Sequence, residues 1–266
     1  MTITRGYSDT REGQLHYRRS GNAGGVPLVL LHQTASSSQS FESLMRLLAD
    51  RFTVIAFDTP GFGQSFDPPA VPDIDYLNRA LLDAMDYLGI SQCHLFGHHT
   101  GACLGVEMAV RYPARLASLT LSGPLPMTVE QQNQYHSSIS SAFLPELTGE
   151  YLLETWRFLA SHGAARRLEV IHRELLDHVR AWRTRAMTYD LVWFQDFAGY
   201  LAQVPCPLLL MCSDDDLLWP FFSRAQEIRP DAQVVVMHGA SNFAADYQPD
   251  LVAKALLTFI GSIRSG

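Results

Sequence analysis

The sequence predicts an α/β protein with a mostly parallel central sheet flanked by helices, and three observations carry this prediction. Several short apolar runs lack the alternation of a half-exposed strand, which is typical of strands buried on both faces of a parallel sheet. Segments with apolar residues at helical spacing separate these runs, as crossovers between parallel strands require. With 266 residues and 47% hydrophobic content, the chain is long enough to bury such a sheet under helices.

The first half of the chain follows this alternation without interruption. A helix is expected over Asp73–Leu88, because Leu77, Leu81 and Met85 recur at helical spacing and Gly89 is placed to end it. Strands are expected at 14–20, 26–31, 52–57, 93–96 and 116–121, and further helices at 41–50 and 102–106.

From Leu125 to about Ala198 the alternation stops. This stretch is rich in helix formers, and its roughly 70 residues exceed an ordinary connection between neighbouring elements. We therefore expect a helical insertion at 125–198 within a core formed by residues 1–124 and 199–266. After the insertion the alternation resumes, with strands expected at 207–212 and 233–237 and helices near 221–228 and at 249–260.

The amino-acid composition argues against several classes of binding partner. The net charge of −7 argues against a nucleic-acid surface and against binding to anionic membranes, and no apolar stretch approaches the roughly 20 residues of a membrane span. No apolar leader stands at the N-terminus, so we expect a cytoplasmic protein. The cysteines lack metal-site or disulfide-framework spacing and are expected to be buried free thiols, namely Cys93, Cys103, Cys206 and Cys212. We expect a small-molecule substrate, no nucleic acid, no membrane and no cofactor, with a homodimer left open.

The chemistry centres on Gly97-His98-His99-Thr100-Gly101, between an apolar strand and a helix of small residues. Strand, glycine, three residues, glycine and helix is the outline of a nucleophile elbow, G-x-S-x-G. In that motif a strained turn raises the middle residue, and the glycines allow strand and helix to pack closely. Here the middle residue is His99 in place of serine.

Three further motifs follow the ends of expected strands in a consistent order. They are His32-Gln33, the turn Asp58-Thr59-Pro60-Gly61-Phe62-Gly63-Gln64-Ser65, and the loop Ser213-Asp214-Asp215-Asp216-Leu217-Leu218-Trp219-Pro220. With the elbow, these motifs make the chain resemble the α/β-hydrolase superfamily along nearly its whole length. The resemblance implies an α/β-hydrolase fold whose helical insertion is a cap over the elbow. It also implies an oxyanion hole from the backbone N–H groups of Gln33 and Thr100, and Asp216 as the acid of the triad.

The same resemblance predicts a degenerate catalytic triad. The family's catalytic histidine should stand about seven residues before a helix-opening proline, and counting back from Pro249 gives Asn242. The nucleophile is thus replaced by His99 and the base by Asn242, while Asp216 survives. Because Asn242 cannot take a proton, acyl-enzyme catalysis by a serine is not expected.

An imidazole at the elbow suits general-base chemistry, because its reference pKa lies near 6.5. We expect Asp216 to accept a hydrogen bond from the amide of Asn242, whose carbonyl oxygen accepts one from His99. This arrangement would fix the tautomer of His99 and leave its other ring nitrogen facing the substrate.

Neighbouring polar residues have competing interpretations. His32 and His98 are candidates for contact with substrate, but His98 is also placed to pack beneath the elbow and His32 to brace the oxyanion loop. The side chains of His98 and His99 are adjacent and should diverge, so we expect no metal site. Asp58 is expected to form a turn rather than to act in catalysis.

The leading function is that of an enzyme acting on a small, largely apolar carbonyl compound, the substrate class that the resemblance implies. In it His99 serves as general base, and hydrolysis by activated water is favoured slightly. One alternative is a cofactor-independent lyase, decarboxylase, isomerase or cyclase, in which His99 takes a proton from the substrate itself. A second is a non-catalytic ligand-binding pseudoenzyme that keeps the pocket.

Overall fold

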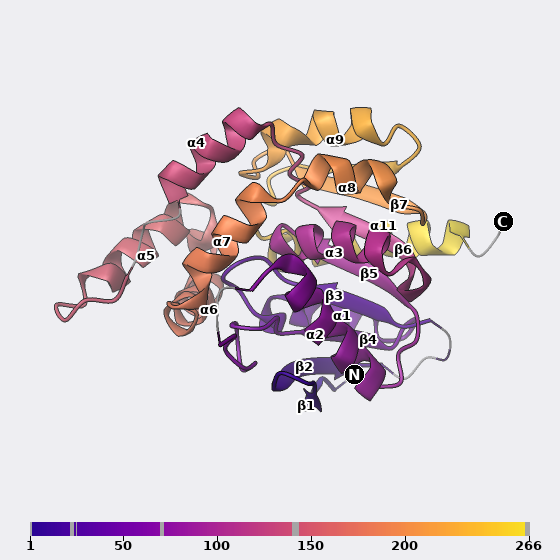
Figure 1. Ribbon diagram of the computed structural model, residues 1–266, viewed down its shortest axis with the longest axis horizontal. Helices are drawn as coiled ribbons and strands as arrows, with labels where there is room; N and C mark the ends of the chain where they lie inside the picture. The colour runs from indigo at the N-terminus through magenta and orange to yellow at the C-terminus, as the bar shows by residue number, and fades with distance from the viewer. Residues whose placement is uncertain (1, 22–23, 25, 70–71, 140–143, 264–266) are drawn as a thin grey trace.

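An eight-stranded, mostly parallel sheet lies at the centre of the computed structural model, which describes residues 2–21, 24, 26–69, 72–139 and 144–263 (Figure 1). The strand order is β1-β2-β4-β3-β5-β6-β7-β8, with antiparallel pairing of β1 with β2 and of β2 with β4, and parallel pairing elsewhere. The strands are β1 Thr4–Asp9, β2 Gln14–Ser20, β3 Leu28–Leu31, β4 Val54–Phe57, β5 Cys93–His98, β6 Leu116–Ser122, β7 Leu208–Ser213 and β8 Gln233–Met237. The predicted fold class is confirmed.

Helices cover both faces of the sheet, and the central strands show why. Val29 and Leu31 of β3 belong to a core cluster with α2, α3, α8 and α9. Leu28 and Leu30 belong to a second cluster with α1, α10 and α11 on the opposite face. Successive side chains of a strand point to opposite faces, so a strand covered on both sides must be apolar throughout. The core helices are α1 Glu42–Leu48, α2 Ile74–Tyr87, α3 Thr100–Arg111, α8 Phe197–Gln203, α9 Phe222–Ile228, α10 Ala244–Tyr247 and α11 Pro249–Ile263.

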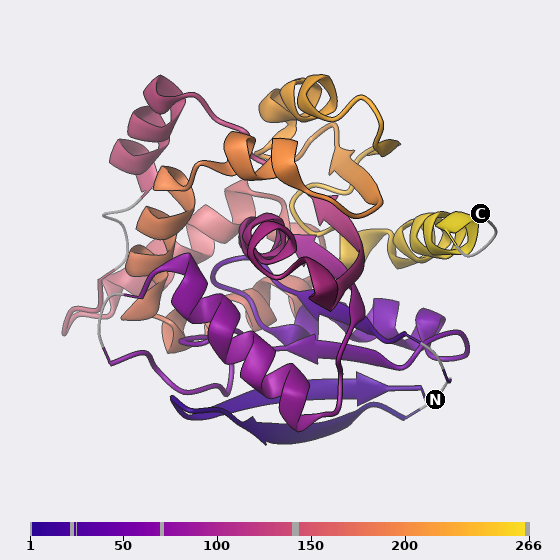
Figure 2. The same ribbon diagram turned by 45° about the vertical axis from the view of Figure 1, so that its right-hand side comes forward.

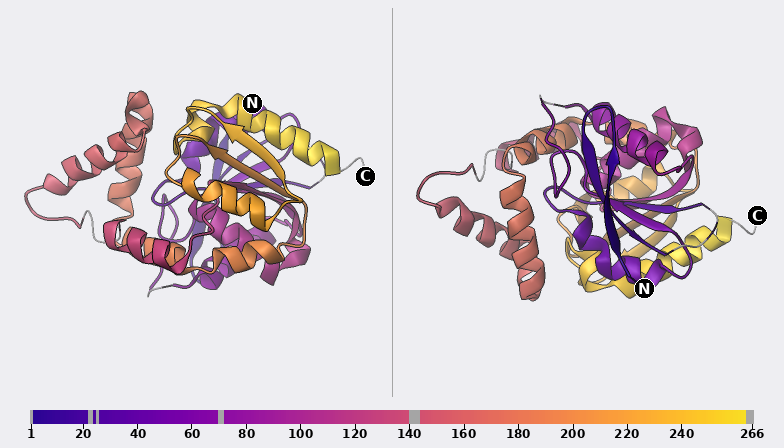
Figure 3. Two further views of the ribbon diagram at one scale, coloured as in Figure 1. Left: turned by 90° about the horizontal axis from the view of Figure 1, so that it is seen from above. Right: turned by 90° about the horizontal axis from the view of Figure 1, so that it is seen from below.

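Four helices follow β6 and stand to one side of the sheet (Figures 1 and 3). These inserted helices are α4 Val129–Ile139, α5 Glu150–Ser161, α6 Leu168–Arg180 and α7 Thr184–Phe194. The expected boundary between residues 198 and 199 falls inside α8, whose Phe197 and Leu201 pack in the same core cluster as α3. In the described part of the chain, no helix is both long and apolar enough to cross a membrane.

One strand was not predicted. β1 forms the edge of the sheet beside β2 (Figure 2), and its burial pattern shows only Ser8 fully buried. An edge strand that leaves most of its side chains exposed needs no apolar pattern, so periodicity gives no signal for it. The predicted core strands and helices are present, with ends shifted by a few residues, and the helix after the elbow continues to Arg111. The cysteines are free; Cys206 is half-buried and the others are buried.

Candidate active site

The elbow has the strained geometry that its sequence predicts. His99 joins β5 to α3 with φ of 48° and ψ of −103°, in a region that few residues other than glycine adopt and that histidine tolerates better than most. A Cβ on Gly97 would clash with the backbone of Gly101, and one on Gly101 would clash with the carbonyl oxygen of Leu31. The two glycines therefore allow the close packing that places His99 at the end of the strand.

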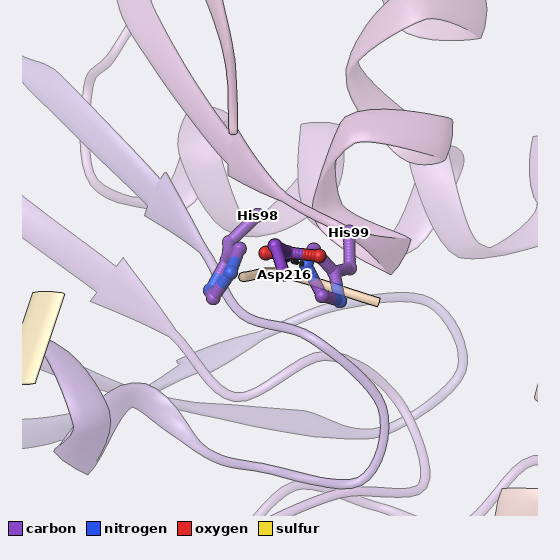
Figure 4. A group of neighbouring side chains, drawn as sticks. All are labelled: His98, His99 and Asp216. Carbon is purple, nitrogen blue, oxygen red and sulfur yellow. Dashed lines mark hydrogen bonds and ion pairs between the residues drawn. The ribbon is translucent and has the colours of Figure 1, made fainter. Parts of the chain in front are cut away.

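His99 hydrogen-bonds directly to the carboxylate of Asp216. Nε2 of His99 donates to Oδ2 of Asp216 at 2.9 Å, while Oδ1 of Asp216 accepts the backbone N–H of Leu218 at 2.7 Å (Figure 4). Neutral His99 that donates from Nε2 carries its lone pair on Nδ1. None of the described residues hydrogen-bonds to Nδ1, and His99 lines a mostly apolar cavity. A buried carboxylate therefore sets the tautomer of this imidazole.

The expected bridge through Asn242 is wrong. Oδ1 of Asn242 accepts the backbone N–H of Leu217 at 2.9 Å, and the imidazole of His99 reaches Asp216 without an intermediary. An imidazole is longer than a serine side chain, so from the elbow it reaches the carboxylate of Asp216 directly. Asn242 lines the cavity and holds the loop that presents Asp216.

Gln33 and Thr100, the candidate oxyanion hole, both line this cavity. Thr100 is the first residue of α3, where a helix leaves backbone N–H groups without internal acceptors. Among the described residues, no acceptor takes the backbone N–H of Gln33 or of Thr100. The hydroxyl of Thr100 donates to Oγ1 of Thr34 at 2.8 Å, which ties the loop after β3 to the elbow.

His32 and His98 do not line the cavity, contrary to their assignment as contacts with substrate. Nδ1 of His32 donates to the carbonyl oxygen of Gln33 at 2.8 Å, and its Nε2 accepts the backbone N–H of Thr59 at 3.0 Å. Burial lowers the pKa of His32, which keeps it in the neutral form that this pairing needs. His32 thus braces the loops after β3 and β4, and His98 is buried beneath the elbow.

The prediction that the side chains of His98 and His99 diverge is also wrong. Their ring centroids lie 4.3 Å apart, because the positive φ of His99 ends the regular alternation of the strand (Figure 4). Together with Asp216 they offer ligand atoms within 4.8 Å of one another, a combination found nowhere else in the described residues. Two of those atoms, Nε2 of His99 and Oδ2 of Asp216, are already joined by their hydrogen bond. Burial, followed by the charge of His99, holds the pKa of His98 well below its usual value.

Asp58 has the surroundings of a structural carboxylate. It is buried away from the cavity and accepts hydrogen bonds from Nδ1 of His16 at 2.8 Å and from the backbone N–H groups of Ser38 and Gln64. Burial acts to raise its pKa, but these donors and the nearby His32 lower it well below its usual value. This geometry supports the turn-forming interpretation.

The cavity has a volume of about 650 Å³ and is enclosed partly by the inserted helices. Its apolar wall includes Leu125, Phe158, Leu159, Val192, Trp193, Leu217, Leu218 and Phe243. Sequence reasoning missed two polar side chains of α6 in the same lining, Glu174 and His178. A signal was available, because they follow Val170 at successive spacings of four and so share its buried face.

A family model described as alpha/beta hydrolase fold matches residues 26–244. The dihydrolipoyllysine-residue acetyltransferase component of the acetoin cleaving system of Pseudomonas putida is 36% identical over 92% of this chain and 66% of its own length. The pimeloyl-[acyl-carrier protein] methyl ester esterase of Aeromonas hydrophila is 26% identical over 89% of this chain and 96% of its own. The crystal structure of E-2-(acetamidomethylene)succinate hydrolase superimposes with a TM-score of 0.77 at 22% identity, covering 98% of this chain and 100% of that one, which supports the fold.

Proposed function

The chain belongs to the α/β-hydrolase fold family, and from this premise we propose that it is a hydrolase without a serine nucleophile, in which His99 activates water. The substrate is a small, largely apolar carbonyl compound, held in the cavity between the elbow and the inserted helices, which act as a cap. The observation that carries the proposal is the pairing of Nε2 of His99 with Asp216 at 2.9 Å, which leaves Nδ1 as the basic atom of a cavity-lining imidazole.

The proposed reaction uses four residues. Nδ1 of His99 takes a proton from water as the water oxygen attacks the substrate carbonyl carbon. The backbone N–H groups of Gln33 and Thr100 stabilise the resulting oxyanion, and Asp216 stabilises the imidazolium. As the tetrahedral intermediate collapses, the bond to the leaving group breaks and His99 returns the proton to that group. The products are an acid and the protonated leaving group.

Transfer of a proton from the substrate itself is the second candidate, and the same Nδ1 supports it. In a lyase, decarboxylase, isomerase or cyclase of this kind, a C–H or O–H group of the substrate would lie next to Nδ1 of His99, at the position that water occupies in the hydrolytic reaction. Turnover in ¹⁸O-labelled water separates the two, because hydrolysis places one labelled oxygen in the acid product. Chemistry on the substrate itself would leave the product unlabelled.

The proposal predicts that His99→Ala lowers kcat/KM at least about 100-fold on whichever member of an ester, lactone and β-diketone panel is turned over, the low end for loss of a general base. His238→Ala is the matched control, because Nδ1 of His238 also pairs with an aspartate, Asp214, at 2.7 Å, but on an exposed loop outside the cavity. Circular dichroism checks that both variants fold. An unchanged rate in folded His99→Ala would show that His99 is not the general base. Binding of panel compounds by the wild type without turnover would support a ligand-binding protein instead.

A further inference from the structure

Two side chains of α6 bring buried, unpaired polar atoms to the lining of the cavity. Glu174 is 0% exposed and His178 is 4% exposed, and the two are one helical turn apart. Among the described residues, Oε2 of Glu174 and Nε2 of His178 have no hydrogen-bond partner. Buried polar atoms are paired in the great majority of cases, so two unpaired acceptors in one cavity lining point to a ligand that donates hydrogen bonds to them.

The hydrogen bonds of His178 define which kind of atom faces outward. Its Nδ1 donates to the backbone carbonyl oxygen of Glu174 at 2.8 Å, so neutral His178 carries a lone pair on Nε2, on the side of the ring away from its own helix. Burial, aided by the charge of Arg185, lowers the pKa of His178 to about 3. Nε2 therefore remains an acceptor at neutral pH.

Glu174 presents a second acceptor. Its Oε1 accepts hydrogen bonds from Oγ of Ser36 at 2.9 Å and from Nη2 of Arg173 at 2.6 Å, so the donors of the protein all serve one oxygen. The guanidinium of Arg173 also pairs with Asp246 at 2.7 Å, so two carboxylates share one cation. Burial raises the pKa of Glu174, and the charge of Arg173 opposes that shift. The other oxygen, Oε2, is left for a donor in the cavity.

The type of donor follows from the rest of the lining. Trp193 is 4% exposed, lines the same cavity and has an unpaired indole N–H among the described residues. A hydroxyl group donates one hydrogen bond and also accepts them, so it can satisfy acceptors and a donor together. An ammonium group can accept none, so it would leave the indole N–H of Trp193 without an acceptor.

We propose that Glu174 and His178 form a polar subsite that binds a hydroxyl group of the ligand in the cavity that contains His99. This inference rests on the proposed function, which supplies the carbonyl group of the substrate. It narrows that substrate to a compound with a hydroxyl donor as well as a carbonyl group.

A pair of non-hydrolysable ketones of matched shape tests the subsite. Isothermal titration calorimetry compares 4-(hydroxymethyl)acetophenone with 4-ethylacetophenone, in which a methyl group replaces the hydroxyl. The wild type should bind the hydroxymethyl ketone about tenfold more tightly, the factor expected for one hydrogen bond to a charged acceptor. Equal binding, tighter binding of the ethyl compound, or no binding of either ketone at millimolar concentration would overturn the proposal.

Two variants assign the preference to the subsite. In Glu174→Gln the amide oxygen should stay with Arg173 and Ser36, which turns the NH₂ group towards the cavity and removes the preference for the hydroxyl. His178→Phe keeps an aromatic ring but removes Nε2, and should reduce the same preference if Glu174→Gln does not fold. Glu169→Gln, an exposed position on the same helix, is the control and should keep the preference. A preference unchanged in both subsite variants would contradict the assignment.

The same titration separates this proposal from the proposed function. The ketones are not turned over, so their binding does not depend on the base. His99→Ala should retain the hydroxyl preference even where it abolishes activity. If Glu174→Gln loses the hydroxyl preference while His99→Ala keeps the wild-type rate, the subsite is supported and the mechanism is refuted. If Glu174→Gln keeps the preference while His99→Ala loses activity, the mechanism is supported and the subsite is refuted.

Discussion

At the scale of single residues, the imidazole of His99 links the elbow to Asp216 without an intermediary. His99 stands at the position of the nucleophile and makes the hydrogen bond to Asp216 that a separate histidine makes in a Ser-His-Asp triad. Asn242, which the sequence resemblance assigns to the position of that separate histidine, accepts the backbone N–H of Leu217. Gln33 and Thr100 line the cavity, and among the described residues no acceptor takes their backbone N–H groups.

This arrangement predicts that a serine hydrolase can be rebuilt with two changes. His99→Ser alone should be nearly inert, because Asn242 cannot activate the hydroxyl, and Asn242→His alone should not gain a nucleophile. The double variant should hydrolyse p-nitrophenyl acetate well above the sum of the single variants, because triad members act as a unit. Intact-mass measurement after fluorophosphonate treatment should show an adduct on the double variant and none on the wild type. A folded double variant that neither hydrolyses the ester nor takes up the label would refute the placement of Asn242 or of the oxyanion hole.

At the scale of elements, the end of β6 lies against the ring of His99. Gly123 follows β6 with φ of +66°, and a Cβ there would lie 2.6 Å from Nε2 of His99 and would also strike Cδ2 of the ring. Both atoms lie on the side of the imidazole that faces Asp216. The glycine therefore provides the room in which the hydrogen bond forms.

Gly123→Ala should consequently displace the ring of His99 and lower kcat/KM by about 100-fold, as expected when a general base loses its orientation. Gly89→Ala is the matched control, because Gly89 has φ of +72° but no atom within 4 Å of an added Cβ. Both variants should lose stability by about 1 kcal/mol through backbone strain, measured by urea unfolding. An activity loss of the same size in both would show that strain, and not contact with His99, is responsible.

At the scale of the whole molecule, a group of half-buried charged side chains joins the inserted helices to the core. Asp177 of α6 lies with its Oδ2 2.7 Å from Oγ of Ser37, in the loop before α1. Arg173, on the same helix, pairs with Asp246 of α10 at 2.7 Å. Burial, followed by the charge of Glu174, raises the pKa of Asp177 to about 7.

This raised pKa predicts how stability depends on pH. Between about pH 4, where an unfolded aspartate titrates, and about pH 7, the folded chain binds more protons at Asp177 than the unfolded chain, so its contribution to the free energy of unfolding falls as pH rises. Asp177→Asn removes the titration. The free energy of unfolding of the variant minus that of the wild type, measured by urea unfolding, should rise by at least about 1 kcal/mol from pH 5 to pH 8.

The exposed Asp250→Asn serves as a control for the substitution itself and should show a smaller change. A constant difference between Asp177→Asn and wild type across this range would contradict the assignment of the titrating group to Asp177.

The sequence predicted the features that follow from local pattern. The alternation of strands and helices predicted the sheet. The spacing of the motifs predicted a common site, and His99, Gln33, Thr100 and Asn242 line one cavity, with Asp216 hydrogen-bonded to His99. The spacing of residues along the chain does not show how far a side chain extends in the folded protein. For this reason the expected hydrogen-bond bridge from His99 through Asn242 to Asp216 was wrong.

The polar lining from α6 was missed for a related reason. Helical periodicity showed which face of α6 is buried but not which part of the core that face meets. The partners of Glu174, from Ser36 in the core to Arg173 beside it, depend on how the inserted helices settle on the sheet. Only the tertiary structure supplies that information.

The sheet order also has a consequence for synthesis of the chain. β6 lies between β5, which ends at the elbow, and β7, which leads to Asp216, and the inserted helices are made between β6 and β7. A nascent chain that has completed the elbow therefore carries an imidazole without its carboxylate until β7 has left the ribosome and paired with β6. The hydrogen bond between His99 and Asp216 can therefore form only late in synthesis.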